Sequence, residues 1–372
     1  MKTKLIKGFC PSLEEPIKAS DGLLFRIRPH MDYLDIEKLV YLCNLSIKYG
    51  SGIMELTNRG SIQIRGIREK YHKFFLNQIL TKKIVKKKIS VLSSNIIINP
   101  LWEHNDQNYK VYNKIIQLES QLPKLPNKFG FIIDLGKKLS LKNVSADIRV
   151  ESASNQKILI RADGASKGKI IQLSDLDSFV LEIVNWFIEN KEKNINRMSE
   201  LLAKKKLPNK WTQDKPICSV YKFLPKNSKI GQILGIKLGR FKAKDLKCLV
   251  LNSKASRIRF TPFKMIVLEK AFNIKDKEFI FKADEPLLNI SACSGINFCS
   301  SATIDTFKLA KKIKNPLNKK IHIAGCKKNC GTNRNTEIIL SGNDSRVDVS
   351  NNFKKKKNLG NFTFLEISRK IF

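Results

Sequence analysis

The chain has 372 residues, the length of two or three ordinary domains, which excludes a peptide hormone or a disulfide-stapled miniprotein. Lys and Arg number 70 against 33 Asp and Glu, a formal net charge of +37, yet a hydrophobic content of 42% is that of a folded globular protein and excludes a disordered basic tail. Such a charge suits a nucleic acid, a membrane surface, an acidic protein or a polyanionic substrate, or it marks a merely Lys-rich surface.

Three features of the sequence restrict the classes of binding partner and the cellular location. The lysine runs at 86–88, 204–206 and 354–357 have no interleaved aromatic residues, and we expect no nucleic-acid partner. The longest uncharged stretch, 286–304, is rich in Ser, Asn, Gly and Cys, so we expect no membrane partner. The first thirteen residues lack the apolar core of a signal peptide, which predicts a cytoplasmic protein whose eight cysteines are thiols or metal ligands.

Hydrophobic periodicity predicts two copies of a β-α-β-β unit. The first copy has expected strands at 23–28, 53–57 and 62–67 and an expected helix at 35–48. The second has expected strands at 233–238, 258–261 and 265–268 and an expected helix at 243–251. The repeated order indicates an internal duplication, and we expect a ligand between the halves, where deep clefts form.

A different α/β segment follows each copy. The first has expected strands at 129–134, 146–151 and 157–162 and a helix at 175–190; the second has a helix at 303–313 and strands at 320–324 and 336–340. Residues 194–215 are polar, Lys-rich and broken by Pro208, which predicts a surface connection between the halves.

Four cysteines form two spaced pairs, Cys293-x5-Cys299 and Cys326-x3-Cys330, among small and polar neighbours. Structural zinc prefers two to four residues between paired ligands, so the wider first pair favours a larger group such as a [4Fe-4S] cluster. The alternative is four buried core cysteines. Cys43, Cys218 and Cys248 lie in apolar contexts and are interpreted as core residues. The role of Cys10 is left open.

The cysteine pairs and the duplicated unit resemble the sulfite and nitrite reductase superfamily over nearly the whole chain. That resemblance implies an α+β fold of two ferredoxin-like half-domains and two α/β domains. It places the half-domains at 10–85 and 220–282, the first α/β domain at 90–205, and a cluster-binding α/β domain at 285–372. The [4Fe-4S] ligands it implies are the four paired cysteines, Cys293, Cys299, Cys326 and Cys330.

The segment 56–66, LTNRGSIQIRG, looks like the strand-turn-strand that grips tetrapyrrole carboxylates in this superfamily, with Arg59 and Gln63 at gripping positions. A guanidinium offers a carboxylate two parallel donors, and residues four apart on a strand point to one face. The further candidates for tetrapyrrole carboxylates are Arg26, Arg65 and Lys128. Arg28 and Arg65 equally suit exposed strand positions.

Within the superfamily, GFCPSL at 8–13, DGLLFRIRP at 21–29, LPNKFGF at 125–131 and ACSG at 292–295 look most like precorrin-3B synthase. This family resemblance implies O2-dependent hydroxylation of precorrin-3A, with γ-lactone formation, in aerobic cobalamin biosynthesis. It also implies a mononuclear non-haem iron and electrons from NAD(P)H through a reductase or a ferredoxin. No two-His-one-carboxylate triad is visible among the four histidines; His322 is a candidate ligand or a structural residue, and the catalytic residues are unknown.

The alternative is a sirohaem-dependent sulfite or nitrite reductase, a family that surrounds its anion with four basic side chains. Arg26 and Lys128 are basic here, whereas Ser94 and Gly130 occupy the other two positions. Losing two charge-assisted hydrogen bonds, about 1.5–3 kcal/mol each, weakens capture of a small dianion and favours the synthase. Gly130 fits the synthase, but Ser94 replaces an Arg expected in both families. A third class is a non-catalytic Fe-S or nucleic-acid-binding protein.

Overall fold

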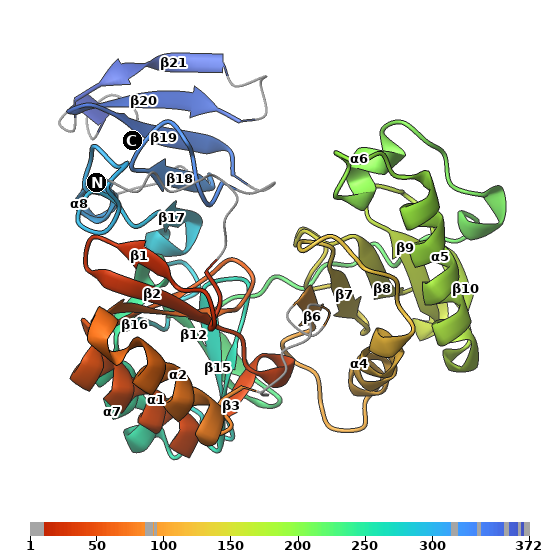
Figure 1. Cartoon of the computed structure of the whole chain (residues 1–372), viewed down its shortest axis with the longest axis horizontal. Coiled ribbons are helices and arrows are strands. Elements are labelled where there is room, and N and C mark those ends of the chain that lie inside the picture. The colour runs from red at the N-terminus through yellow and green to blue at the C-terminus, as the bar shows by residue number, and fades with distance from the viewer. Residues whose placement is uncertain are drawn as a thin grey trace. The chain divides into compact units, whose positions relative to one another are not determined.

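The computed structural model describes residues 11–85, 92, 95–313, 319–332, 336–352, 357–363 and 366–367 (Figure 1). The chain divides into two compact units. Unit 1 comprises the described parts of 1–29, 33–85 and 224–372, and unit 2 those of 30–32 and 86–223. Among the described helices, none combines the length and the apolar character needed to cross a membrane.

Unit 1 contains a five-stranded sheet and a six-stranded sheet that exchange a short strand. The first has the order β1-β2-β5-β4-β13 and the second β11-β12-β15-β14-β3, with β16 also paired to β12. The first sheet is built from β1 (Ile17–Ala19), β2 (Gly22–Ile27), β4 (Ile53–Leu56), β5 (Ile62–Ile67) and β13 (Arg240–Lys242). The second is built from β3 (Tyr33–Asp35), β11 (Lys226–Ser228), β12 (Gly231–Ile236), β14 (Arg257–Phe260), β15 (Met265–Glu269) and β16 (Phe279–Ile280). The predicted β-α-β-β order is confirmed in both copies. Each copy also contributes a short strand to the sheet of the other copy: β3 pairs with β14, and β13 pairs with β4.

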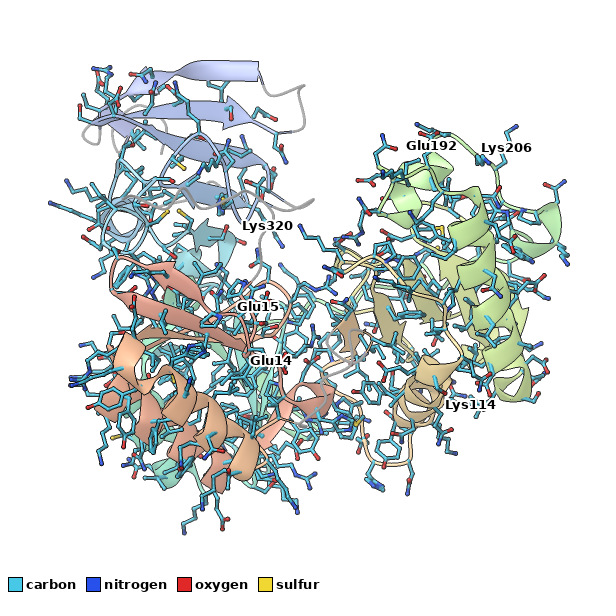
Figure 2. All side chains as sticks on the ribbon, viewed as in Figure 1. Glu14, Glu15, Lys114, Glu192, Lys206 and Lys320 are labelled. Atoms are coloured by element: carbon cyan, nitrogen blue, oxygen red, sulfur yellow. The ribbon has the colours of Figure 1, made fainter. Side chains whose placement is uncertain are left out.

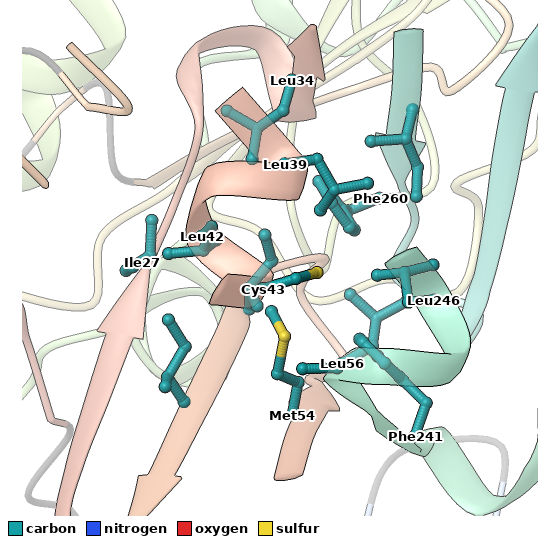
Figure 3. Close-up of a cluster of buried hydrophobic side chains, with 14 of the residues drawn as sticks. Ile27, Leu34, Leu39, Leu42, Cys43, Met54, Leu56, Phe241, Leu246 and Phe260 are labelled. Atoms are coloured by element: carbon teal, nitrogen blue, oxygen red, sulfur yellow. The ribbon is translucent and has the colours of Figure 1, made fainter. Parts of the chain in front are cut away.

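The core of the two sheets is packed by equivalent helices, α1 (Ile36–Tyr49) and α7 (Ala243–Ser253), together with α2 (His72–Thr81). Figure 3 shows Leu42 and Cys43 of α1 in the same buried cluster as Met54. Burial raises the pKa of the Cys43 thiol to about 12, so this cysteine is a core residue, as predicted. Cys218 and Cys248 are exposed, which corrects the expectation that they are buried.

A third sheet in unit 1 has the order β17-β18-β19-β20-β21. Its strands are β17 (Ile290–Ala292), β18 (Ile321–Ala324), β19 (Ile338–Asn343), β20 (Arg346–Asn351) and β21 (Lys357–Phe362), and α8 (Thr306–Lys312) lies between β17 and β18 in sequence. Because β17, β18 and β19 are parallel, their carboxyl ends lie at the same edge of the sheet. The segments that follow β17 and β18 therefore come together.

Unit 2 is one mixed sheet, β10-β9-β8-β7-β6, with helices. Its elements are β6 (Ile96–Ile98), α4 (Gln107–Gln117), β7 (Phe131–Asp134), β8 (Ile148–Ser152), β9 (Ile158–Ala162), β10 (Lys169–Ile171), α5 (Leu176–Asn190) and α6 (Met198–Leu202). Lys114 of α4, labelled in Figure 2, forms an ion pair with Asp177 of α5 at 2.7 Å. The predicted surface connection at 194–215 is partly wrong, because it contains α6 and buries Met198 and Trp211.

Candidate functional site

One face of the first sheet carries a row of polar side chains across four strands. Arg26 of β2 is paired in register with Gln63 of β5, and Gln63 is paired with Glu55 of β4. Glu55 is in turn paired with Arg240 of β13. Since directly paired residues of adjacent strands point to the same face, the strand exchange adds Arg240 to the row that the first copy begins.

A cavity of about 260 Å³ within unit 1 lies against this row. Arg26 and Gln63 line it from the first sheet, and Lys264 lines it from the turn between β14 and β15. Cys293 and Cys330 line it from the segments that follow β17 and β18 of the third sheet. Two predicted carboxylate-binding residues and two predicted cluster ligands therefore meet at one cavity.

Two cations of this cavity, Arg26 and Lys264, form no ion pair with the residues that the structure describes. The Nε atom of Arg26 is buried and has no hydrogen-bond partner. Burial lowers the pKa of Lys264 to about 8, an effect that Glu55 and Cys293 oppose. Its Nζ is 3.5 Å from the carbonyl oxygen of Leu238, and within the described residues it forms no ion pair. A buried donor without a partner costs about 1–3 kcal/mol, so the cavity is suited to an anion.

Arg65 does not face an open ligand site, which corrects the expectation that it contacts a substrate carboxylate. Its side chain is only 2% exposed. Its five N–H groups reach both carboxylate oxygens of Asp21, Oε2 of Glu55, Oγ of Ser294 and the carbonyl oxygen of Phe298, at 3.1–3.4 Å. No donor remains for a substrate. Arg65 instead anchors the segment that contains Cys293 and Cys299 to the first sheet.

The other predicted contacts are placed differently. Arg59 is half-buried in the turn between β4 and β5, where its backbone N–H donates to Thr57 Oγ1 at 3.3 Å. Lys128 is an exposed residue of unit 2. The backbone N–H of Gly130 donates to Asp147 Oδ2 at 2.9 Å. Ser94 lies outside the described residues, as does Cys10.

The cysteine pairs follow the parallel strands of the third sheet. Cys293 comes directly after β17, and Gly325 and Cys326 come directly after β18. The backbone N–H of Gly325 donates to the sulfur of Cys293 at 3.0 Å. Burial raises the pKa of the Cys293 thiol, backbone hydrogen bonds from Gly325 and Gly295 oppose this, and the nearby Cys299 and Cys326 raise it further. Cys299 and Cys326 therefore each lie close enough to Cys293 to affect its thiol.

The donor set suits a cluster better than a single ion. Within the described parts of the chain, no three His, Cys, Asp or Glu side chains form a group that could hold one metal ion. A four-iron cluster places each thiolate on a different iron and so needs ligands farther apart. Glycines next to Cys326 and Cys330 leave no space for a side chain. A Cβ on Gly325 would come within 2.5 Å of Ala302 Cβ, and a Cβ on Gly331 would come within 3.1 Å of His322 Cε1. Free thiols, close N–H groups and small residues fit a [4Fe-4S] cluster.

His322 is a structural residue of this site. Burial lowers its pKa to about 4, assisted by Lys264, so the ring is neutral at pH 7. Since a carbonyl only accepts, Nε2 donates to the Cys330 carbonyl oxygen at 2.8 Å, and Nδ1 then accepts from the Ser291 hydroxyl, also at 2.8 Å. Both ring nitrogens are engaged, which argues against the reading of His322 as an iron ligand.

Sequence reasoning missed Lys264 as a lining residue of the cavity, although the duplication contained the signal. Lys264 lies in the turn between β14 and β15, and Arg59 lies in the equivalent turn between β4 and β5. Lys264 is the equivalent of Gly60, the residue after Arg59, so only a search of the whole equivalent turn would have found it. Asp21, the partner of Arg65, had no comparable signal, because the two residues are separated by 44 positions.

Comparison with known proteins gives three findings. Residues 16–79 match the family model described as the nitrite/sulfite reductase ferredoxin-like half domain. Over 156 residues, 40% of this chain, the sequence is 33% identical to a precorrin-3B synthase from Sinorhizobium sp, and the match spans only 33% of that protein's length. The solved structure of the Mycobacterium tuberculosis NirA protein is similar with a TM-score of 0.67 at 13% identity, over 93% of this chain and 79% of that one.

These findings confirm the sulfite/nitrite reductase-like fold expected from the sequence. The NirA likeness extends over nearly all of the chain, and the half-domain match covers β1, β2, β4 and β5, which form most of the sheet that lines the cavity. The chain therefore has a sulfite/nitrite reductase-like fold, carries a nitrite/sulfite reductase ferredoxin-like half domain at residues 16–79, and shares part of its sequence with a precorrin-3B synthase.

Proposed function

We propose that the chain is a precorrin-3B synthase, which hydroxylates precorrin-3A with O2 and forms a γ-lactone in aerobic cobalamin biosynthesis. The observation that carries this proposal is the cavity where Arg26 and Gln63 stand with Cys293 and Cys330. The partial identity to a precorrin-3B synthase supports it.

The residues of the cavity have separable tasks in this reaction. Arg26 offers the forked donors that bind a carboxylate arm of the tetrapyrrole, and the side-chain amide of Gln63 adds a further donor on the same face. One oxygen atom of O2 enters the product and the other leaves as water, which requires two electrons and two protons. When bound to the four cysteines, a [4Fe-4S] cluster supplies electrons one at a time from a reductase or ferredoxin that draws on NAD(P)H.

A mononuclear non-haem iron does not fit the described residues. A two-His-one-carboxylate site needs three converging ligands, and the described chain holds no such group. Both ring nitrogens of His322 are hydrogen-bonded, so neither is available to bind an iron. We therefore assign no step of the reaction to such an iron.

A sirohaem-dependent sulfite or nitrite reductase is the second candidate, because the NirA likeness extends over 93% of the chain. Against it stands Gly130, which fits the synthase and occupies one of the four positions that are basic in the reductases; Ser94 replaces an Arg expected in both families and does not separate them. A cavity with fewer cations binds a small dianion less tightly. The charge pattern therefore favours the synthase.

The two candidates differ in what they bind. Protein purified anaerobically from cells that make sirohaem is tested by absorption spectroscopy and by assays of iron and acid-labile sulfide. The synthase predicts about four iron and four sulfide per chain, a broad Fe-S absorption without tetrapyrrole bands, and turnover of precorrin-3A. Sharp sirohaem bands, with nitrite or sulfite reduction and no conversion of precorrin-3A, would overturn the proposal.

A further inference from the structure

We infer that Lys264 is a substrate-binding residue, and that Lys264 and Arg26 together bind one carboxylate arm of the tetrapyrrole. The inference rests on the proposed function for the identity of the ligand. It adds a contact from the second copy of the duplicated unit to contacts that the sequence indicated only in the first copy and in unit 2.

The first observation is the backbone at Lys264. In the β4–β5 turn, the N–H of Thr57 donates to the Ser61 carbonyl, and Gly60 has a φ of +76°. In the β14–β15 turn, the N–H of Thr261 donates to the Met265 carbonyl, which makes Lys264 the equivalent of Gly60, and its φ is +55°. Glycine adopts this left-handed conformation without cost, whereas a long side chain is strained there. Strain at a cavity wall points to a function for the side chain.

The second observation is that the structure makes room for the lysine stem. Gly239 also lines the cavity and has a φ of +75°. A Cβ at Gly239 would come within 2.8 Å of Lys264 Cδ and 3.2 Å of its Cε. The bare backbone of Gly239 thus lets the stem of Lys264 pass along the cavity wall.

The third observation is the balance of charge around the cavity. Glu55 is the one carboxylate among the described residues that line it, and Glu55 already accepts hydrogen bonds from Arg65 and Arg240. Arg26 Nε has no partner, and Lys264 has no ion pair within the described residues. A buried guanidinium N–H without a hydrogen bond and an ammonium group without an ion pair in the described part of the chain are suited to bind an anion.

The size of the cavity limits that anion. About 260 Å³ lies below the roughly 300–1,000 Å³ of pockets that enclose drug-sized ligands, so the space takes one acidic arm of a tetrapyrrole or one small anion. We assign the space to an acidic arm of a tetrapyrrole because the proposed substrate is a tetrapyrrole. Nitrite is the competing source of the same charge, and it is included in the test.

The test compares four variants of the full chain. Lys264→Gly restores the residue found in the equivalent turn, Lys264→Met keeps an uncharged stem, and Lys264→Arg keeps the charge. Lys244→Met is the matched control, because Lys244 is exposed on α7 and does not line the cavity. Affinity is measured by fluorescence titration with metal-free uroporphyrin III, which carries eight carboxylates, and separately with nitrite as a competitor. Thermal unfolding is recorded for every variant.

We expect Lys264→Gly and Lys264→Met to weaken uroporphyrin binding by about 10- to 100-fold, the loss caused by one charge-assisted hydrogen bond. Lys264→Arg and Lys244→Met should bind as the unaltered chain does, and Lys264→Gly should unfold at no lower temperature. Unchanged uroporphyrin affinity in both Lys264→Gly and Lys264→Met would overturn the inference. If these variants also unfolded at a lower temperature, the role of Lys264 would be purely structural. Loss of nitrite competition with unchanged uroporphyrin affinity would also overturn it, in favour of a small-anion site. Turnover of precorrin-3A by the unaltered chain tests the proposed function independently.

Discussion

Substituting Arg65 tests whether the segment with the first cysteine pair is held by a buried ionic network. Arg65→Met keeps much of the apolar stem but removes hydrogen bonds to Asp21, Glu55, Ser294 and the Phe298 carbonyl. It also removes the guanidinium that lies 4.6 Å from the centre of the Phe298 ring. The side chains of Asp21 and Glu55 are only 13% exposed, so the carboxylates stay desolvated after their partner is lost.

Removing one partner of a buried ion pair costs about 3–5 kcal/mol, because the other charge remains buried. Glu55 keeps its hydrogen bond from Arg240 Nε at 2.8 Å, so most of the penalty falls on Asp21. We therefore expect Arg65→Met to lower the free energy of unfolding by about 3 kcal/mol, at the lower end of that range. Arg65→Met/Asp21→Asn should recover part of the loss, because the stranded charge is gone.

The assay is urea unfolding at pH 7 followed by circular dichroism, with iron and sulfide content measured on the same preparations. Arg68→Met is the control, because Arg68 is exposed and its change should stay within about 0.5 kcal/mol. Iron content should fall in Arg65→Met, whereas uroporphyrin affinity of the folded fraction should be retained. A loss below about 1 kcal/mol with full iron content would refute the anchoring role. Loss of tetrapyrrole affinity with normal stability would instead restore Arg65 as a ligand contact.

Three further predictions follow from the site and from unit 2. Arg59→Ala should weaken precorrin-3A binding without loss of iron or sulfide, as measured by equilibrium titration; an unchanged affinity would remove Arg59 from the site. Cys326→Ser should lower iron and sulfide content in colorimetric assays, whereas Cys248→Ser, at an exposed thiol, should not; equal metal content in both would contradict the proposed ligand set. Burial raises the pKa of Asp134 to about 6, so its protonated form favours folding at low pH and this contribution is lost as the pH rises through 6. Relative to Asp134→Asn, the unaltered chain should therefore lose about 2–3 kcal/mol between about pH 4 and pH 7 in urea unfolding, and a pH-independent difference would show that Asp134 titrates normally.

Much of the architecture could be predicted because its determinants are local. The apolar spacing around Leu39 and Cys43 marks a helix with one buried face, and the repeated β-α-β-β order marks the duplication. The exchanged strands β3 and β13 could not be found in this way. Each has three residues, too few for a periodic pattern, and each pairs with a strand from the other copy.

The site was predictable to a different degree. Spacing indicated the cysteine pairs, and the family resemblance indicated Gln63, which the folded sheet pairs with Arg26. Strand alternation puts Arg65 beside Gln63, but whether such an arginine meets a ligand or a protein carboxylate depends on Asp21, which only the folded sheet brings near. Lys264 was not predicted because a lone lysine in a turn is ordinarily solvated. Its position in the cavity depends on the space that Gly239 leaves for its stem, which the sequence does not show.

The most direct measurement of the central claim uses isotopically labelled O2. Anaerobically purified protein with its cluster intact is supplied with precorrin-3A, a reduced ferredoxin and labelled O2, and the product is examined by mass spectrometry. A precorrin-3B synthase should yield a product that has gained one labelled oxygen atom, with the lactone formed. Unchanged precorrin-3A, from protein that carries sirohaem and reduces nitrite under the same electron supply, would contradict the proposed function.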